Sequence, residues 1–187
     1  VALPPLLLVM ALLTVMSLDF VLSGALDVLG VAWADEVLGD GEVAAGLVIG
    51  AMGIGGLLGA LAGSAATGGR RIARIVLAGA VIEGAIFAVL ALVGLLVPAM
   101  VLLAIAGFGG AVTLVAGRTL LQRTTDDRVL ARVFAVQESV SLLGIAIGAA
   151  VVPWLIDSVG ARGTWVPFGV MALLVTLLCW RAVSRLD

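Results

Sequence analysis

Long apolar runs dominate the chain, and short clusters of charged residues separate them. Five stretches carry no charge or a single acidic residue: 43–69, 75–97, 98–117, 133–156 and 163–180. A helix needs about 20 apolar residues to cross the hydrocarbon core of a bilayer. Each stretch therefore predicts a transmembrane helix.

The opening segment also predicts a helix, although its apolar pattern is interrupted. Residues 4–33 are apolar except at a few positions, of which Asp19 lies near the middle. Gly24 and Gly30 permit local unwinding towards the far end of this helix. The sequence thus predicts an all-α membrane domain with six spans, at approximately 4–33, 43–66, 75–97, 98–120, 130–156 and 163–183. No stretch shows the alternation of apolar and polar residues that a membrane barrel requires.

Composition indicates lipid as the surrounding solvent. Hydrophobic residues make up 63% of the chain and charged residues only 12%, and the mean hydropathy is +1.32. A water-soluble fold of this length cannot cover its surface with so few polar groups. The expected partner is the lipid bilayer, and nothing in the sequence indicates nucleic-acid binding.

Arginine placement predicts the orientation of the six spans. All ten basic residues are arginines, and nine fall in or beside the links on one side: Arg70, Arg71, Arg74, Arg118, Arg123, Arg128, Arg132, Arg181 and Arg185. Arg162 alone falls on the other side, and the link between the first two spans is acidic. Because basic residues remain on the cytoplasmic side, both termini are expected in the cytoplasm.

The charged turn between the fourth and fifth spans has the composition of a helix cap. Thr124, Thr125, Asp126 and Asp127 precede the fifth span, and Arg128 follows them. Hydroxyl and carboxylate oxygens at such positions accept hydrogen bonds from the free N–H groups of the first helical turn. We expect this turn, with Arg70 and Arg71 of the earlier one, to lie at the cytoplasmic interface.

Three segments carry a family resemblance. Residues 117–162, "GRTLLQRTTDDRVLARVFAVQESVSLLGIAIGAAVVPWLIDSVGAR", resemble the tenth-to-eleventh helix region of major facilitator superfamily transporters, closest to the bacterial drug- and siderophore-exporter branch. "SGALDVLGVAWADEVLG", residues 23–39, is similar to the outer half of the family's seventh helix. "GAMGIGGLLGALAGSAATGGRRIAR", residues 50–74, is similar to its eighth helix and the following turn.

This resemblance extends over essentially the whole chain and implies the C-terminal half of a twelve-helix fold. It implies secondary transport, with proton-coupled export of a small amphipathic molecule across the bacterial plasma (inner) membrane. The implied partner is an N-terminal six-helix half, in the same chain or another, or a second copy. The chain starts at Val1 rather than Met, as a fragment, a processed product or a trimmed chain would. The alternative function is a membrane-anchoring or sensing module fused to cytoplasmic regulatory domains, for example cyclic-nucleotide-binding ones.

Acidic residues inside the spans are the main candidates for chemistry. A charged side chain at the bilayer centre costs roughly 2.5–3.5 kcal/mol, which suggests a compensating role. Glu83 in the third span is interpreted either as a protonatable carboxylate facing a cavity or as a carboxyl group that hydrogen-bonds between helices. Asp19 invites the same two interpretations. Asp27 lies eight residues later, and either lines the cavity or lies at the outer interface.

Glu138 either lines the transport cavity or pairs with Arg132 or Arg118 near the cytoplasmic surface. The two arginines are accordingly candidates for conformational ion pairs.

Two sets of regularly spaced glycines have a structural interpretation. Glycines recur every four residues at Gly55, Gly59 and Gly63 and at Gly144 and Gly148, and such spacing allows close helix packing.

Several chemistries are excluded by composition. The chain has no histidine and one cysteine, Cys179, which excludes a histidine relay, a histidine-based triad, an internal disulfide and a multi-cysteine metal site. The glycine-rich "GIGGLLG" segment lies in an apolar helix without a preceding strand or a lysine, unlike a phosphate-binding loop. We therefore expect no enzymatic activity, no cofactor and no metal.

Overall fold

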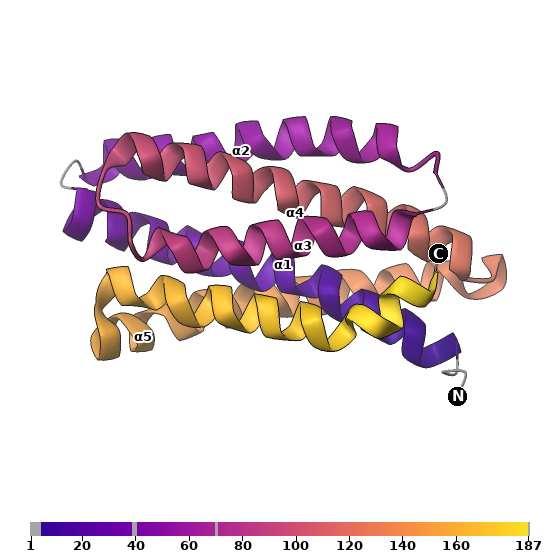
Figure 1. Ribbon diagram of the computed structural model, residues 1–187. Helices are drawn as coiled ribbons and strands as arrows, with labels where there is room; N and C mark the ends of the chain where they lie inside the picture. Colours follow the sequence, from indigo (N-terminus) through magenta and orange to yellow (C-terminus); the bar gives the residue numbers. More distant parts are fainter. Residues whose placement is uncertain (1–4, 39–40, 70, 187) are drawn as a thin grey trace.

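The computed structural model describes residues 5–38, 41–69 and 71–186, and they are almost entirely helical. The elements in chain order are α1 (Pro5–Trp33), a short π-helix η1 (Ala34–Leu38), α2 (Gly41–Ala66), α3 (Ile72–Leu90), α4 (Leu96–Thr124), α5 (Asp127–Val183) and a 3₁₀ turn η2 (Ser184–Leu186). The helices run roughly along one common direction and form an elongated bundle (Figure 1).

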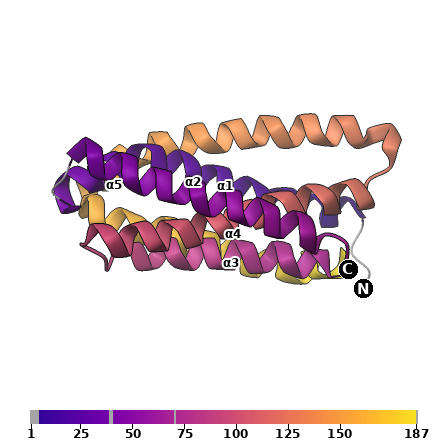
Figure 2. The ribbon, with the colours of Figure 1, turned by 90° about the horizontal axis from the view of Figure 1, so that it is seen from above.

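Five helices of the described chain are long and apolar enough to cross a membrane, where six had been expected. The difference arises in α5, whose 57 residues include both of the last two expected spans. A straight helix of that length would extend about 85 Å. Instead the chain reverses direction within α5, as Figures 1 and 2 show.

The reversal in α5 occurs at Gly160, whose backbone is not helical, with φ 76° and ψ 163°. This region of backbone space is open almost only to glycine. A single residue therefore replaces the loop that was expected between the spans at 130–156 and 163–183. We call residues 127–159 the first arm of α5 and residues 161–183 its second arm.

Helix packing follows a simple pairing. Helix α1 packs mainly against α5, and α2 packs mainly against α4. Helix α3 lies against both α4 and α5. The start of α1, the end of α5 and the turn between α4 and α5 all lie at the same end of the bundle (Figure 1).

The interior contains two separate apolar clusters stacked along the bundle. One includes Trp33, Phe87 and Trp165. The ring of Trp165 meets those of Trp33 and Phe87 edge to face, with centroids 5.3 and 5.4 Å apart. The other cluster includes Met16, Leu77 and Leu121 and lies towards the opposite end of α1, α3 and α4. The middle of these three helices lies between the two clusters.

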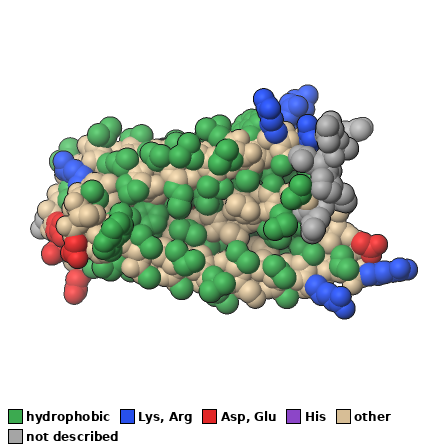
Figure 3. Space-filling model, turned by 90° about the horizontal axis from the view of Figure 1, so that it is seen from below, with side chains coloured by type: hydrophobic (Ala, Val, Ile, Leu, Met, Phe, Trp, Pro, Cys, Tyr) green, Lys and Arg blue, Asp and Glu red, His purple; other side chains and the backbone are tan. Residues whose placement is uncertain are grey.

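The outer surface is apolar along the length of the bundle. Large side chains such as Leu57, Leu92 and Leu178 are 64%, 82% and 81% exposed. Figure 3 shows hydrophobic side chains along the body and charged side chains gathered at its two ends. Such a surface matches a hydrocarbon layer between two aqueous faces. The helices are those of an integral membrane protein by length and composition.

Candidate functional site

Asp19 and Glu83 form a pair of carboxyl groups at the centre of the bundle. Their side chains lie within hydrogen-bonding reach of each other. Asp19 is the middle residue of α1, and Glu83 lies two residues after the middle of α3. Glu83 is 2% exposed, whereas Asp19 is partly buried. The two acids that sequence analysis treated separately therefore meet at one point.

Gly110, the middle residue of α4, is the third part of this site. A β-carbon built on Gly110 would lie 3.0 Å from the Glu83 Oε1 atom and would collide with the Asp19 Oδ1 atom. Both carboxyl groups thus lie against the bare backbone of α4. Any side chain larger than that of glycine would displace them.

Close approach of α3 and α4 places Glu83 beside Gly110. A β-carbon on Gly79 would lie 2.5 Å from both the carbonyl oxygen of Gly109 and the Thr113 Oγ1 atom. The buried Thr113 hydroxyl lies 3.2 Å from the carbonyl oxygen of Val76, on the facing helix. Glycines on both helices allow the backbones to touch, and the threonine hydrogen-bonds across the contact.

The surroundings of the acid pair are apolar. On α1, α3 and α4, residues of one apolar cluster precede the pair and residues of the other follow it. In the described part of the chain, no N–H or O–H group donates to the buried Glu83 Oε1 atom. Two ionised carboxylates in contact repel each other strongly where the dielectric constant is low. A hydrogen bond between them requires that one carry a proton.

Asp27 lies outside this pair. It is on α1, eight residues after Asp19, and its side chain is exposed. The distance along the helix axis is about 12 Å. Of the two acids on α1, only Asp19 reaches α3.

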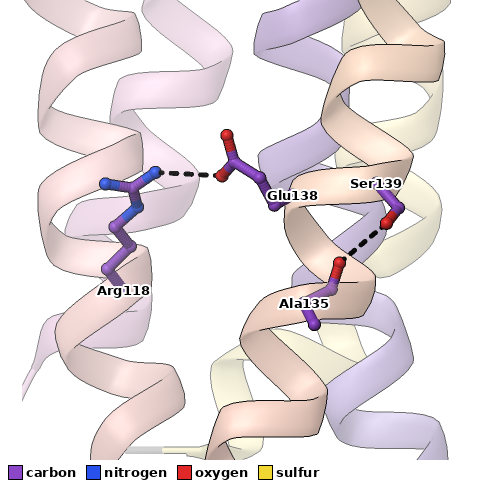
Figure 4. A network of polar contacts seen from close by, with 4 residues as sticks. All are labelled: Arg118, Ala135, Glu138 and Ser139. Carbon is purple, nitrogen blue, oxygen red and sulfur yellow. Dashed lines mark hydrogen bonds and ion pairs between the residues drawn. The ribbon is translucent and has the colours of Figure 1, made fainter.

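Glu138 forms an ion pair with Arg118 across α4 and the first arm of α5. The Arg118 Nη2 and Glu138 Oε2 atoms are 3.7 Å apart, and the two side chains are 45% and 61% exposed. Figure 4 shows them pointing towards each other, while Ser139 is turned to its own helix. The Ser139 hydroxyl donates to the carbonyl oxygen of Ala135 at 2.9 Å. The pair links two helices at an open face of the bundle.

Arg132, the other expected partner of Glu138, lies at a different place. It is exposed and borders a shallow apolar groove of about 240 Å³ that Met10 and Val136 also line. Of the two arginines proposed as conformational partners, Arg118 is the one that the structure pairs with Glu138.

The charged turns at one end of the bundle are held by local hydrogen bonds. Asp126 caps α5, because its Oδ1 atom accepts from the backbone N–H of Arg128 at 2.9 Å. Asp127 follows in the first turn of the helix, where a negative charge is favourable. Arg71 precedes α3 and makes no side-chain cap there, and Arg70 lies outside the described residues.

Arg123 joins this end of α4 to the turn between α2 and α3. Its guanidinium group donates to the carbonyl oxygens of Thr67 at 2.9 Å and Gly69 at 3.4 Å. Sequence analysis did not predict this contact or the role of Gly110 and Thr113. Their sequence signal was a cluster of glycines in the fourth span, Gly107, Gly109 and Gly110, and an arginine near the end of that span.

Two apolar grooves follow the helix pairs. One, of about 520 Å³, lies between α1 and the first arm of α5 and is lined by residues that include Ser17, Val21, Gly144 and Ile147. The other, of about 350 Å³, lies between α2 and α4. Within the described residues, no group of three or more His, Cys, Asp or Glu side chains is placed to hold a metal ion. No protein-family model, curated protein or solved structure matches this chain.

Proposed function

We propose that this chain is one half of a secondary active transporter that exports a small amphipathic molecule in exchange for protons. The observation that carries the proposal is the Asp19–Glu83 pair, which lies near the middle of α1 and α3 and has Glu83 buried. Ionisable residues inside a membrane are costly, and those that are kept commonly line substrate or proton pathways. The family resemblance of the sequence points to the same activity.

The repeats are visible in the way that glycines pack. Gly24 on α1 lies against the backbone of Ile145 on α5, and Gly148 on α5 lies against the backbone of Val21 on α1. Each helix thus presents a glycine to the other. The two contacts bring α1 and the first arm of α5 together without intervening side chains.

Helices α4 and α2 make the same pair of contacts. Gly107 on α4 lies against the backbone of Met52 on α2, and Gly55 on α2 lies against the backbone of Ala104 on α4. Constant shifts along the chain relate the two helix pairs: 83 positions separate Gly24 from Gly107 and Val21 from Ala104, and 93 positions separate Met52 from Ile145 and Gly55 from Gly148.

Helix α3 and the second arm of α5 complete the symmetry. A β-carbon on Gly84 would lie 3.3 Å from the backbone nitrogen of Leu173, and Gly169 lies against the backbone of Ala88. A shift of 85 positions relates Gly84 to Gly169 and Ala88 to Leu173. These contacts support a chain of two related units, α1–α3 and α4–α5.

This architecture supports transport. Each unit crosses the bundle three times, so consecutive units would enter the membrane from opposite sides. Inverted repeats of this kind recur in secondary transporters, whose substrate and coupling-ion sites lie near the midplane at the repeat interface. Asp19 and Glu83 belong to the first unit and Gly110 to the second, so the acid pair lies at that interface.

The two grooves support a partner that packs along these helix pairs. Val21, Leu18 and Ile147 line the groove between α1 and α5, and their counterparts Ala104, Val101 and Ile54 line the groove between α2 and α4. Two grooves related by the internal symmetry fit a partner with the same symmetry. We propose an N-terminal six-helix half as that partner, in a bacterial inner membrane, with the arginine-rich end and both termini in the cytoplasm.

The test is dye export by the full-length reading frame in inverted membrane vesicles. With a proton gradient imposed, vesicles that contain the protein should accumulate amphipathic fluorescent dyes from a panel, and a protonophore should abolish the accumulation. Asp19→Asn and Glu83→Gln should each remove gradient-driven accumulation, whereas Asp27→Asn serves as the matched control and should not. If vesicles with the protein never exceed vesicles without it, the proposal is wrong.

A further inference from the structure

The contact between Asp19 and Glu83 has a consequence beyond the choice of coupling ion. We infer that the two carboxyl groups, held over Gly110, form a single site that exchanges one proton, rather than two independent proton carriers. The inference rests on the proposed function for its use in transport, but proton binding itself can be measured without transport.

One oxygen of the buried Glu83 carboxyl group lacks a hydrogen-bond donor among the described residues. Glu83 is 2% exposed, and among the described residues no donor reaches its Oε1 atom. A buried acceptor without a partner is costly, and the carboxyl group of Asp19 interacts with that of Glu83 beside Gly110. A proton carried by either acid supplies the missing donor.

The apolar surroundings limit the charge that the two carboxyl groups can carry together. With no proton, two negative charges are in contact between two apolar clusters, and the repulsion is large because the dielectric constant is low. With one proton, a hydrogen bond forms between an acid and a carboxylate, which is the strong, charge-assisted kind. With two protons the site is neutral. The fully ionised state is the one that the geometry excludes, so one proton remains while a second is exchanged.

Other charged groups on α1, α3 and α4 lie away from the acid pair along the helix axes. On α4, Arg118 lies eight residues after Gly110, about 12 Å along the axis, and it pairs with Glu138 of α5. On α3, Arg74 lies nine residues before Glu83, about 13 Å along the axis. On α1, Asp27 is exposed. The neighbouring charges are therefore at other levels of the bundle, and the two carboxyl groups titrate against each other.

The small number of oxygen atoms at the site favours a proton over a metal cation. Hard cations such as Ca²⁺ and Mg²⁺ take about six oxygen ligands. The two carboxyl groups are within direct hydrogen-bonding reach, and the Thr113 hydroxyl is turned to the carbonyl oxygens of Val76 and Gly109. A proton between two oxygens fits this arrangement better than an ion with a full ligand shell.

The site also provides an asymmetric route for the proton. Asp19 is partly buried, whereas Glu83 is almost fully enclosed. Of the two acids, Asp19 is therefore the more accessible to a proton that enters or leaves. Because Asp19 is on α1 and Glu83 on α3, a change in occupancy alters the force between these helices directly beside α4.

Infrared difference spectroscopy on the purified full-length protein in lipid tests this inference. Between alkaline and acidic buffer, the unsubstituted protein should gain the carbonyl stretch of one protonated carboxyl group in an apolar environment, and the band should shift in heavy water. Asp19→Asn and Glu83→Gln should each change this same band, and the double variant should remove it. Asp27→Asn should leave it as it was.

Several results would overturn the inference. A band that responds to only one of the two substitutions would mean that one acid binds the proton alone. A gain of two protonated groups, or of none, would contradict a site that exchanges one proton, and loss of the band when sodium replaces choline would indicate a metal cation.

Two further comparisons distinguish an effect on the proton site from a general loss of stability and from a loss of transport. The variants Gly110→Ala and Gly53→Ala form a second matched pair, because a β-carbon at Gly53 would meet no atom within 4 Å. Only Gly110→Ala should perturb the band. If the infrared band behaves as expected but the protein transports no dye, the proton site stands and the proposed transport function is wrong. Proton-driven transport without the band would refute the site alone.

Discussion

The packing of α2 against α4 gives the sharpest test of the structure, through two glycines two positions apart on the same helix. Gly55 is buried against α4, and Gly53 is exposed. A β-carbon added at Gly55 would lie 2.8 Å from the Cα atom of Ala104 and closer still to its carbonyl group. The obstacle is backbone, so α2 and α4 must separate to accommodate it.

The magnitude follows from two opposing effects of replacing glycine by alanine. Alanine stabilises a helix by roughly 0.8–1 kcal/mol relative to glycine, chiefly through the entropy of the unfolded chain. Overpacking at a close contact costs about 1–3 kcal/mol. Gly53→Ala should therefore be neutral or slightly stabilising, because only the first effect applies. Gly55→Ala should be less stable than Gly53→Ala by about 1–3 kcal/mol, because both variants share the first effect.

Reversible unfolding in mixed detergent micelles, followed by far-UV circular dichroism, measures the difference between the two variants. The internal symmetry adds a second comparison, because Gly148 packs against Val21 as Gly55 packs against Ala104. Gly148→Ala should be destabilised to a similar extent. Equal stabilities for Gly53→Ala and Gly55→Ala would refute the helix contact and, with it, the pairing on which the two repeats are based.

Three further predictions concern the ends of the bundle. Gly160→Ala should lower the free energy of unfolding by about 1–3 kcal/mol, because alanine is strained in this backbone conformation. An unchanged unfolding midpoint would mean that the two arms of α5 are not joined as described. Arg123→Ala should speed amide hydrogen exchange at Thr67 and Gly69, whose carbonyl groups it binds, whereas Arg128→Ala should not; equal rates in both variants would argue against the contact. In a chain without its native cysteine, a cysteine at position 128 should react with an impermeant maleimide only in inverted vesicles, and labelling of intact cells would reverse the proposed orientation.

Much of the helical architecture could be predicted because hydrophobicity acts locally. An apolar run of sufficient length must form a helix in lipid, since its backbone groups have no other partners. The cap at Asp126 is also local, because it depends on a side chain and an N–H group two residues apart. The break within α5 could not be predicted in this way. A single glycine at Gly160 makes the reversal, and many other glycines in the chain lie within unbroken helices.

The acid pair could not be predicted because it depends on helix rotation. Asp19 and Asp27 are both acids on α1, about 80° apart around the helix axis, and the sequence does not state which of them faces α3. Glycine contacts on α1 and α4 settle that rotation in the folded chain. Arg132 lies six residues before Glu138 on the same helix, about 120° away around its axis, whereas the pair with Arg118 depends on how α4 packs against α5.

The position of the acid pair connects stability with mechanism. On α1, α3 and α4, apolar residues could fill the space between the two apolar clusters and join them into one core. Replacing buried polar groups by apolar ones of similar size is often neutral or stabilising. Two acids and a glycine instead interrupt the core at the middle of three helices. At this level α1 meets α3 and α4 through two carboxyl groups and a glycine rather than through interlocking apolar side chains. Under the proposed function, a proton that binds or leaves at this point would change the force between α1 and α3 directly beside α4.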